Sequence, residues 1–263
     1  PLPLRYTAGE RAREREAHFV SEVLFVGTSD AFGAGGRRQS AVLARGRRGT
    51  LLVDCGATTA SGLAALGVDR NEIDAIAVSH FHADHFAGIP QILLAACYVD
   101  ARRSPLWIAG PPQVEQRVRA LADAMGHPIE RALPFELHFL ELPPGRVHEV
   151  GPARIESFAT HHQIEANPHG YRIDTGDQRI AYSGDTGWFE ELPRAVAGAE
   201  LFICECTQLH RHLDFHLSLD ELAAHRDRFD CGRMVLTHLG EQMHERRDDC
   251  GFDTADDGGT LSR

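Results

Sequence analysis

The sequence predicts an α/β fold in which β-sheets are covered by helices, in two βα halves. Apolar runs bounded by turn residues recur along the chain, which is typical of strands, and helical patterns separate several of them. Polar residues suited to ligand binding stand at or just beyond the ends of these runs, where α/β proteins collect functional groups. The chain has 263 residues, of which 43% are hydrophobic and 25% charged, and this is enough to bury a sizeable core.

The expected strands begin as a group and then alternate with helices. Strands are expected at residues 21–27, 40–46, 50–56, 73–80, 105–110, 136–142, 153–162, 170–176, 178–185, 199–205 and 232–240. Helices are expected at residues 60–67, 88–100, 112–126, 188–198 and 218–229. In the last of these, Ser218 stands three residues before Glu221, which is the spacing of a capping box at a helix start. This order favours sheets with helices packed on their faces.

We predict one domain over residues 21–263, preceded by a charged extension over residues 1–20. The opening residues lack the apolar centre of a secretory signal, and no apolar run reaches the length of a membrane span. The six cysteines are scattered and form no CxxC pair. In a chain of this length that pattern argues against a disulfide framework and favours a reducing, cytoplasmic setting.

The charge balance bears on the class of partner. A formal net charge of −11 argues against a broad nucleic-acid surface, because affinity for phosphates comes mainly from lysine and arginine. Arginines cluster locally at residues 37–38, 45–48 and 102–103, so a small anionic substrate remains compatible with the sequence. Two roles stay open for residues 100–148: lining the substrate pocket or covering the sheet.

The six residues HFHADH hold three histidines and an aspartate, namely His80, His82, Asp84 and His85. Imidazole nitrogens and carboxylate oxygens are ligands of transition metals, and zinc accepts this mixture well. In extended backbone, His80 and His82 point to one side. Asp84 and His85 can point toward a second position once the chain turns into the next helix. These four residues cannot serve two catalytic ions alone, because each ion needs about three protein ligands and an open position for water.

Suitable ligands at other strand ends complete the set. The segment FATHH offers His161 or His162, AYSGDTG offers Asp185, and VLTHLG offers His238. Their alternatives are ordinary: Asp185 could be a turn or helix-capping residue, and His238 a buried structural histidine. His162 is favoured over His161 because it shares a strand face with Phe158.

One assignment divides the seven residues between two ions: a first group of His80, His82 and His162, a second group of Asp84, His85 and His238, and Asp185 as a bridge. Two ions about 3.5–4 Å apart can hold a hydroxide and clamp the attacking and leaving oxygens of a displacement. Zn²⁺ is the expected metal, and Mn²⁺ or Fe would accept the same ligands.

HFHADH resembles the HxHxDH signature of the metallo-β-lactamase superfamily, and the later histidine, aspartate and histidine follow in that superfamily's order. VGTSDAFGAGGRRQS, PHGYRI, AYSGDT and VLTHLG resemble its ribonuclease Z-like branch, and the likeness runs from about Val23 to the C-terminus. It implies a metallo-β-lactamase-like four-layer αββα sandwich of two βα halves, and a hydrolase with two divalent metal ions. For Asp54 in LLVDCG it implies a position behind the ligands that orients the metal-binding loop. Counting back from GYR, it also favours His162.

ICECT and FHLS resemble the HEAT and HST segments of ribonuclease Z enzymes, where a glutamate and a histidine cooperate in proton transfer to the leaving oxygen. The matching positions are Glu205 and His216, and the match is partial because Cys204 replaces the first histidine of HEAT. A nearby carboxylate raises the pKa of an imidazole, so His216 could serve as a general acid. With Asp84, these are the candidate catalytic residues. The alternative for His216 is a surface histidine that caps a helix.

The resemblance implies hydrolysis by a metal-activated hydroxide and leaves the substrate open. Only IDTGDQRIAY separates Arg172 from Ser183, where this branch carries a flexible RNA-binding arm. The missing arm and the net charge of −11 favour a phosphodiesterase with a small-molecule or short nucleotide substrate, without extended nucleic acid or membrane as a partner. A homodimer is compatible with the resemblance. The alternatives are a β-lactamase, lactonase or thioester hydrolase, a tRNA 3′-processing endoribonuclease, and a non-catalytic metal-binding protein.

Overall fold

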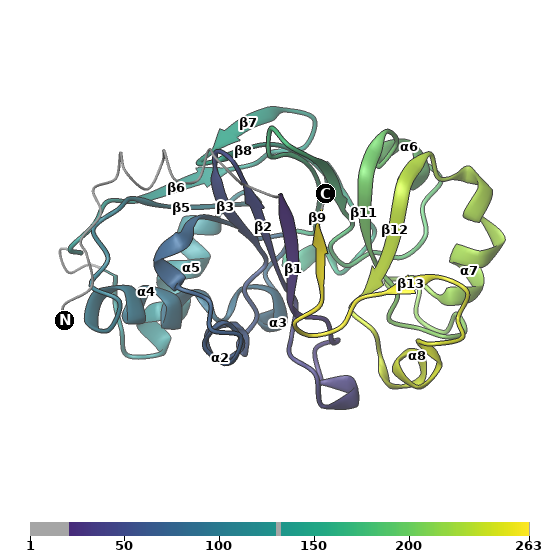
Figure 1. Cartoon of the computed structure of the whole chain (residues 1–263), viewed down its shortest axis with the longest axis horizontal. Coiled ribbons are helices and arrows are strands. Elements are labelled where there is room, and N and C mark those ends of the chain that lie inside the picture. Colours follow the sequence, from purple (N-terminus) through teal and green to yellow (C-terminus); the bar gives the residue numbers. More distant parts are fainter. Residues whose placement is uncertain (1–20, 130–132, 263) are drawn as a thin grey trace.

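The computed structural model describes residues 21–129 and 133–262, and the extension predicted over residues 1–20 lies outside them. Two mixed seven-stranded sheets face each other, and helices cover the outer face of each (Figure 1). The strand orders are β14-β1-β2-β3-β4-β5-β6 and β13-β12-β11-β10-β9-β8-β7. The predicted α/β fold with four layers is therefore confirmed.

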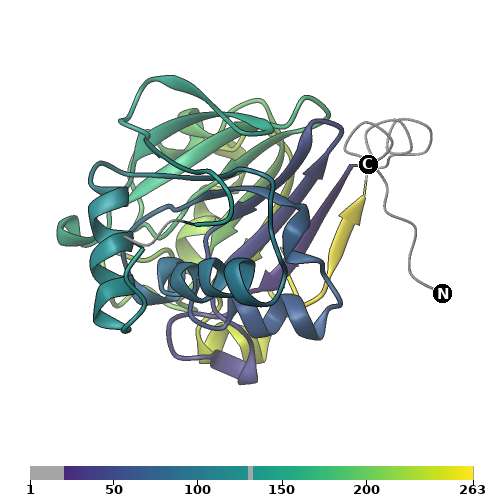
Figure 2. The same ribbon diagram turned by 90° about the vertical axis from the view of Figure 1, so that its left-hand side faces the viewer.

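The first sheet comes mainly from the N-terminal half. It contains β1 (Glu22–Gly27), β2 (Ala41–Gly46), β3 (Gly49–Val53), β4 (Ile73–Ala77), β5 (Leu106–Gly110), β6 (Leu137–Glu141) and β14 (Thr260–Ser262). The helices α2 (Thr59–Ala65), α4 (Ile89–Tyr98) and α5 (Val114–Ala124) cover it and lie toward the viewer in Figure 2. Side chains alternate along each strand, so Leu52 packs against the helices while Leu51 and Val53 face the other sheet.

The second sheet comes from the C-terminal half. It contains β7 (Val147–Val150), β8 (Ala153–Ala159), β9 (His169–Asp174), β10 (Arg179–Tyr182), β11 (Ala199–Glu205), β12 (Cys231–Thr237) and β13 (Asp253–Thr254). The helices α6 (Leu192–Ala195), α7 (Leu219–Ala224) and α8 (Glu241–Arg246) cover its outer face. The predicted capping box is present at α7, where Ser218 and Glu221 each accept a hydrogen bond from the other's backbone N–H.

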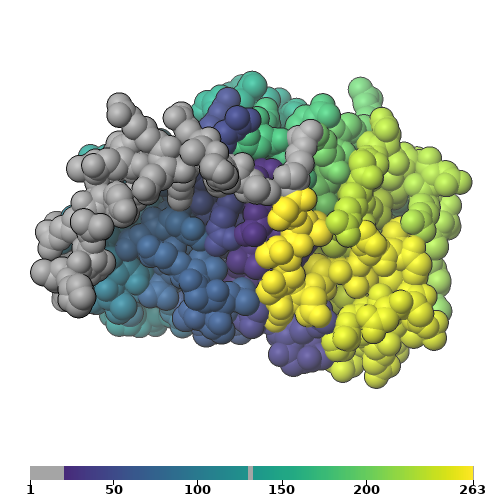
Figure 3. Space-filling model, viewed as in Figure 1, coloured from purple at the N-terminus to yellow at the C-terminus, as the bar shows by residue number. Residues whose placement is uncertain are grey.

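The two halves are joined by a shared core and by the end of the chain. Inward-facing side chains of both sheets, such as Phe25 and Ile173, form one buried cluster. The fully buried Tyr171 on β9 donates its hydroxyl proton to the carbonyl of Val78, just beyond β4. β14 returns to pair antiparallel with β1, and Figure 3 shows the yellow C-terminal residues against the purple strand. The ends of β4 in the first sheet and of β8 and β10 in the second sheet are thereby held close to one another.

Several predicted elements are longer than the observed ones. The strands expected at 73–80, 153–162 and 178–185 end at Ala77, Ala159 and Tyr182, because the chain turns out of the sheet there. The helix expected at 188–198 is only one turn, and the helix expected at 218–229 breaks at His225 into α7 and a 3-10 turn, Arg226–Arg228. The short elements β7, β13, β14, α3 (Ala83–Phe86) and α8 were not predicted.

The clustered arginines are structural. Arg37, Arg38, Arg45 and Arg47 form ion pairs with Asp256, Asp257, Glu72 and Asp177, respectively. Arg102 is buried and donates hydrogen bonds to backbone carbonyls. These five arginines therefore support surface turns and strand ends. Likewise, much of segment 100–148 becomes β5, α5 and β6, so it builds the sheet and its cover. Within the described ranges, no helix has the length and apolar composition that crossing a membrane requires.

Candidate metal centre

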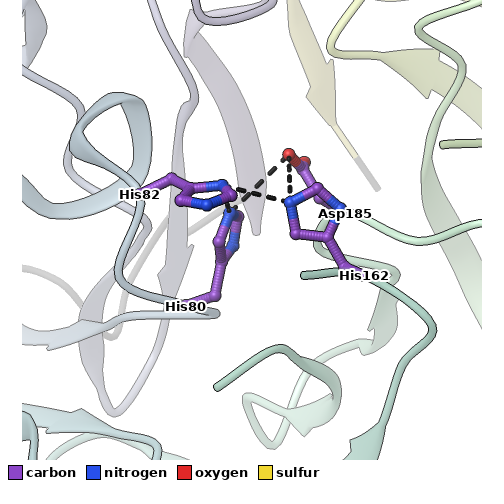
Figure 4. A group of neighbouring side chains, drawn as sticks. All are labelled: His80, His82, His162 and Asp185. Carbon is purple, nitrogen blue, oxygen red and sulfur yellow. Dashed lines mark hydrogen bonds and ion pairs between the residues drawn. The ribbon is translucent and has the colours of Figure 1, made fainter. Parts of the chain in front are cut away.

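The first group of predicted ligands meets at the edge where β4, β8 and β10 end (Figure 4). The His82 Nδ1 atom lies 3.2 Å from His80 Nε2 and 3.1 Å from His162 Nε2. One carboxylate oxygen of Asp185 lies 3.7 Å from the His80 nitrogen and 3.9 Å from the His162 nitrogen. Three imidazole nitrogens and one carboxylate oxygen thus face a common point. His161 lies outside this group: its side chain is exposed, and its ring contacts Phe189.

The second group lies next to the first and is wholly buried. The His85 Nε2 atom lies 3.3 Å from Asp84 and 3.2 Å from Asp185. The His238 Nε2 atom lies 3.2 Å from Asp84 and 3.5 Å from Asp185. Asp185 belongs to both groups, which is the geometry that the bridging assignment requires.

Close backbone packing holds the loop that carries HFHADH in this position. A side chain at Gly56 would begin 2.2 Å from the carbonyl oxygen of Asp84, so only glycine lets these two segments approach. His238 and Asp54 have left-handed backbones, with φ of 54° and 59°. Such conformations cost non-glycine residues about 1–3 kcal/mol each, and they persist where the surrounding structure fixes them. The site residues are therefore held by the fold, and the local sequence alone would not favour this geometry.

Asp54 lies behind the second group and is fully buried. Its carboxylate accepts hydrogen bonds from the backbone N–H of Ser79 at 2.6 Å, its hydroxyl at 2.8 Å, His85 Nδ1 at 2.7 Å and the Tyr182 hydroxyl at 2.6 Å. Because His85 donates through Nδ1, its Nε2 atom is the one that faces the second group. An acceptor behind a ligand fixes its tautomer and raises its basicity.

A histidine and a glutamate form a third group beside the first two. His216 Nδ1 donates to Glu205 at 2.8 Å, and Glu205 also accepts hydrogen bonds from the backbone N–H groups of Thr186 and Thr207. The His216 ring lies 4.8 Å from the ring of His162. Burial alone would lower the pKa of His216. The negative charge and the hydrogen bond of Glu205 have the larger combined effect and raise this pKa to about 9. His216 is therefore a cation near neutral pH, with a proton it can give away.

This geometry agrees with comparisons to known proteins. A family model described as anti-Pycsar protein Apyc1 matches residues 21–255. The chain belongs to the anti-Pycsar protein Apyc1 family. Ribonuclease Z of Mycobacterium bovis (strain BCG / Pasteur 1173P2) is 29% identical to this Apyc1-family chain over 238 residues, covering 82% of this chain and 85% of the relative.

Two solved structures share the fold of the Apyc1-family chain. The metallo-β-lactamase fold protein YhfI from Bacillus subtilis superposes with a TM-score of 0.74 at 22% identity, covering 93% of this chain and 99% of that one. Human tRNase Z, short form, also gives 0.74 at 22% identity, covering 92% and 98%. The predicted resemblance is confirmed: the chain is a ribonuclease Z-like member of the metallo-β-lactamase superfamily. Its curated relatives are hydrolases, which supports a metal-dependent hydrolase.

The donor set of the Apyc1-family chain fits divalent metal ions. His85 Nε2 and Asp185 Oδ1 are buried without a hydrogen-bond partner among the described residues, although they lie 3.2 Å apart. Burial would lower the pKa of His85, but the carboxylates around it, Asp185 and Asp84 foremost, raise it well above its usual range. Burial would raise the pKa of Asp185, yet the histidines, His238 foremost, hold it well below its usual range. Buried carboxylates in this number require positive charge, and divalent ions supply it.

The residues behind the ligands were mostly not predicted. His162 Nδ1 donates to the carbonyl of Phe215 at 2.8 Å, and His238 Nδ1 lies 2.8 Å from the Thr207 hydroxyl. Thr207 Oγ1 also lies 3.0 Å from Glu205, so one hydroxyl links the second group to the proton donor. Thr207 could have been found from the sequence, because it matches the threonine of HEAT. The Phe215 carbonyl could not, because any residue type has a backbone carbonyl.

We expect the Asp54→Asn variant to bind divalent metal about 10–100-fold more weakly, because the amide cannot keep all the donors that the carboxylate accepts. Metal affinity is measured by competition with a chromogenic chelator. Asp253→Asn is the matched control, since Asp253 is exposed and pairs with Arg233 on the surface. Equal metal affinities for Asp54→Asn and the control would contradict the orienting role.

Proposed function

We propose that the protein is a phosphodiesterase that uses two divalent metal ions to hydrolyse a small or short phosphodiester. The observation that carries this proposal is the His216–Glu205 pair, placed beside both metal-facing groups. A phosphodiester with an alkoxide leaving group needs a proton donor at the departing oxygen. Hydrolysis of a β-lactam, lactone or thioester on this fold does not require that pair.

The metal ligands in this proposal are the predicted seven, divided as predicted, with Asp54 behind them. Ions held there would supply an activated water and stabilise charge in the transition state, and Zn²⁺ is the expected metal. Asp185 would bridge the two groups, because its Oδ2 atom lies 3.7 Å from His80 Nε2 and its Oδ1 atom lies 3.2 Å from His85 Nε2. Asp84 faces His85 and His238, and it remains a candidate catalytic residue that would orient the attacking water.

His216 would act as the general acid. Its Nδ1–H is engaged by Glu205, so the proton on Nε2 is the one available to the leaving oxygen. Glu205 cannot turn away, because Thr186 and Thr207 donate to its two oxygens at 2.9 and 3.0 Å. The carboxylate therefore orients the imidazole and favours its charged form before reaction.

A small substrate is supported by the hairpin between β9 and β10. The segment that would carry an arm is a tight turn at residues 175–178, closed by a hydrogen bond from the Thr175 N–H to the Gln178 carbonyl at 3.1 Å. Gly176, with φ of +85°, supplies the left-handed position of this turn. With a net charge of −11, the chain also lacks the basic balance of nucleic-acid-binding proteins. The predicted homodimer and cytoplasmic setting stay predictions.

A second candidate function is endonucleolytic processing of tRNA, which the 29% identity to ribonuclease Z favours. One substrate panel separates the candidates: bis(p-nitrophenyl) phosphate, cyclic nucleotides, a precursor tRNA, a β-lactam, a lactone and a thioester. We expect metal-loaded protein to cleave the small phosphodiesters. Cleavage of the precursor tRNA alone would favour the second candidate, and cleavage confined to the last three compounds would overturn both.

A further inference from the structure

The loop between β11 and α7 carries both His216 and the carbonyl of Phe215, and it contains neither helix nor strand. Residues 210–212 at its tip are exposed. An irregular exposed loop is normally among the less ordered parts of a protein. Proton transfer in the proposed reaction requires the opposite, because the donor must be held within hydrogen-bond reach of the leaving oxygen.

The side chain of Gln208 accounts for this order. It is 2% exposed and lies inside the loop. Its Nε2 group donates to the carbonyl of Leu213 at 2.8 Å and to the carbonyl of His216 at 2.7 Å. Its Oε1 atom accepts from the backbone N–H groups of His212 and Leu213, each at 2.7 Å. A primary amide offers two donors and two acceptor positions, and all four are used within this one loop.

The backbone of Gln208 closes the base of the same loop. Its N–H donates to the carbonyl of Leu217 at 3.1 Å, and its carbonyl accepts from the N–H of Leu219 at 2.8 Å. The loop therefore wraps around one buried residue that contacts its base, its middle and its returning end. Compact loops whose ends meet and whose interior is filled by their own side chains are ordered in this way.

The ordered loop reaches two parts of the site. The carbonyl of His216 bonds to Gln208, and the ring of His216 bonds to Glu205, so backbone and side chain are fixed separately. One residue earlier, the carbonyl of Phe215 accepts from His162 Nδ1 at 2.8 Å. A shift of the loop would therefore move the proton donor and loosen one metal-facing imidazole.

We propose that Gln208 is a positioning residue for the hydrolytic reaction. Its hydrogen bonds fix the conformation of the loop that carries His216. The expected change in kcat rests on the proposed phosphodiesterase function. The ordering of the loop by the amide is a separate consequence that can be measured without any substrate.

The test compares Gln208→Met, which keeps the length of the side chain without its hydrogen bonds, with Gln208→Glu, which can accept but not donate. Gln116→Met on the exposed face of α5 is the matched control. We expect Gln208→Met to lower kcat on the order of 10–100-fold for a dialkyl phosphodiester, because misplacing a catalytic group costs that much. The loss should be clearly smaller for bis(p-nitrophenyl) phosphate, because its leaving group departs without a proton and only the loosening of His162 would affect its hydrolysis. KM should change little. Gln208→Glu should lose at least as much as Gln208→Met, because its second carboxylate oxygen would face the carbonyl oxygens of Leu213 and His216 without a proton to donate.

The second readout is tryptic cleavage after Arg211, at the tip of the loop, followed by mass spectrometry. Cleavage of this bond should become at least several-fold faster in both Gln208→Met and Gln208→Glu, with no change in Gln116→Met. If Gln208→Met does not fold, the same comparison is made with Gln208→Glu. Unchanged cleavage at Arg211, or an equal loss of kcat on both substrates, would overturn the proposal. If wild-type protein hydrolyses no phosphodiester, the proposed function fails, while cleavage at Arg211 still decides whether Gln208 orders the loop.

Discussion

The Asp185→Asn variant is expected to lose more than about 100-fold in kcat/KM for phosphodiester hydrolysis. Removing a residue behind a metal ligand typically costs about 10–100-fold in metal affinity or activity. Removing a bridging ligand should cost more. Asp185 is 2% exposed, and its two oxygens face both metal-facing groups. Asparagine has nearly the same shape but carries no charge and turns an N–H₂ group toward the imidazoles. Metal content per chain, measured by mass spectrometry on the same preparation, should fall together with the activity.

The matched control for this variant is Asp253→Asn, which makes the same chemical change at an exposed carboxylate on β13. Both proteins should show the same far-ultraviolet circular dichroism, since neither substitution changes the sheets. An Asp185→Asn protein that keeps full metal content and full activity would show that Asp185 is not a bridge. An Asp185→Asn protein that keeps its metal but loses activity would show that Asp185 acts in catalysis and does not bridge the ions.

The His216→Ala variant is expected to lose about 10²–10⁴-fold in kcat for dialkyl phosphodiesters, which is the usual contribution of a general acid. The reason is the charged imidazole that Glu205 maintains at 2.8 Å. Bis(p-nitrophenyl) phosphate should be hydrolysed at nearly the wild-type rate, because p-nitrophenolate needs no proton to depart. The two rates are measured under identical metal loading.

The control for His216→Ala is His127→Ala, because His127 is exposed and lies beyond the end of α5. His216→Ala should bind metal like wild type, since its ring is not among the seven predicted ligands. Equal losses on both phosphodiesters, or none on the dialkyl substrate, would contradict the role of His216 as a general acid.

The positions of three metal-facing residues could be predicted because each follows a strongly apolar strand. The runs before His80, Asp185 and His238 identify strands, and the C-terminal ends of parallel strands collect functional groups. That β4 meets β10 and β12 across the two sheets depends on the whole fold. The ambiguity between His161 and His162 followed from extending β8 past Ala159. Beyond that residue the chain is no longer a strand, so side-chain alternation does not apply, and the turn directs His162 inward.

The residues behind the ligands could not be found by the same reasoning. Gln208 acts through four hydrogen bonds to a loop without periodic structure, and a single glutamine in such a loop has no distinguishing pattern. Tyr182 reaches Asp54 across 128 positions of sequence, so their contact depends on the whole fold. The partners of the clustered arginines could not be found either, because proximity in sequence does not reveal the carboxylates that face Arg37 or Arg45 in the folded chain.

The most direct test of the account is the rate of dialkyl phosphodiester hydrolysis as metal-free protein is titrated with Zn²⁺ or Mn²⁺. The account predicts no hydrolysis without metal and a rate that rises until about two ions are bound per chain. Hydrolysis that persists at full rate in metal-free protein would contradict it. So would protein that binds two ions and cleaves a lactam, a lactone or a thioester but no phosphodiester.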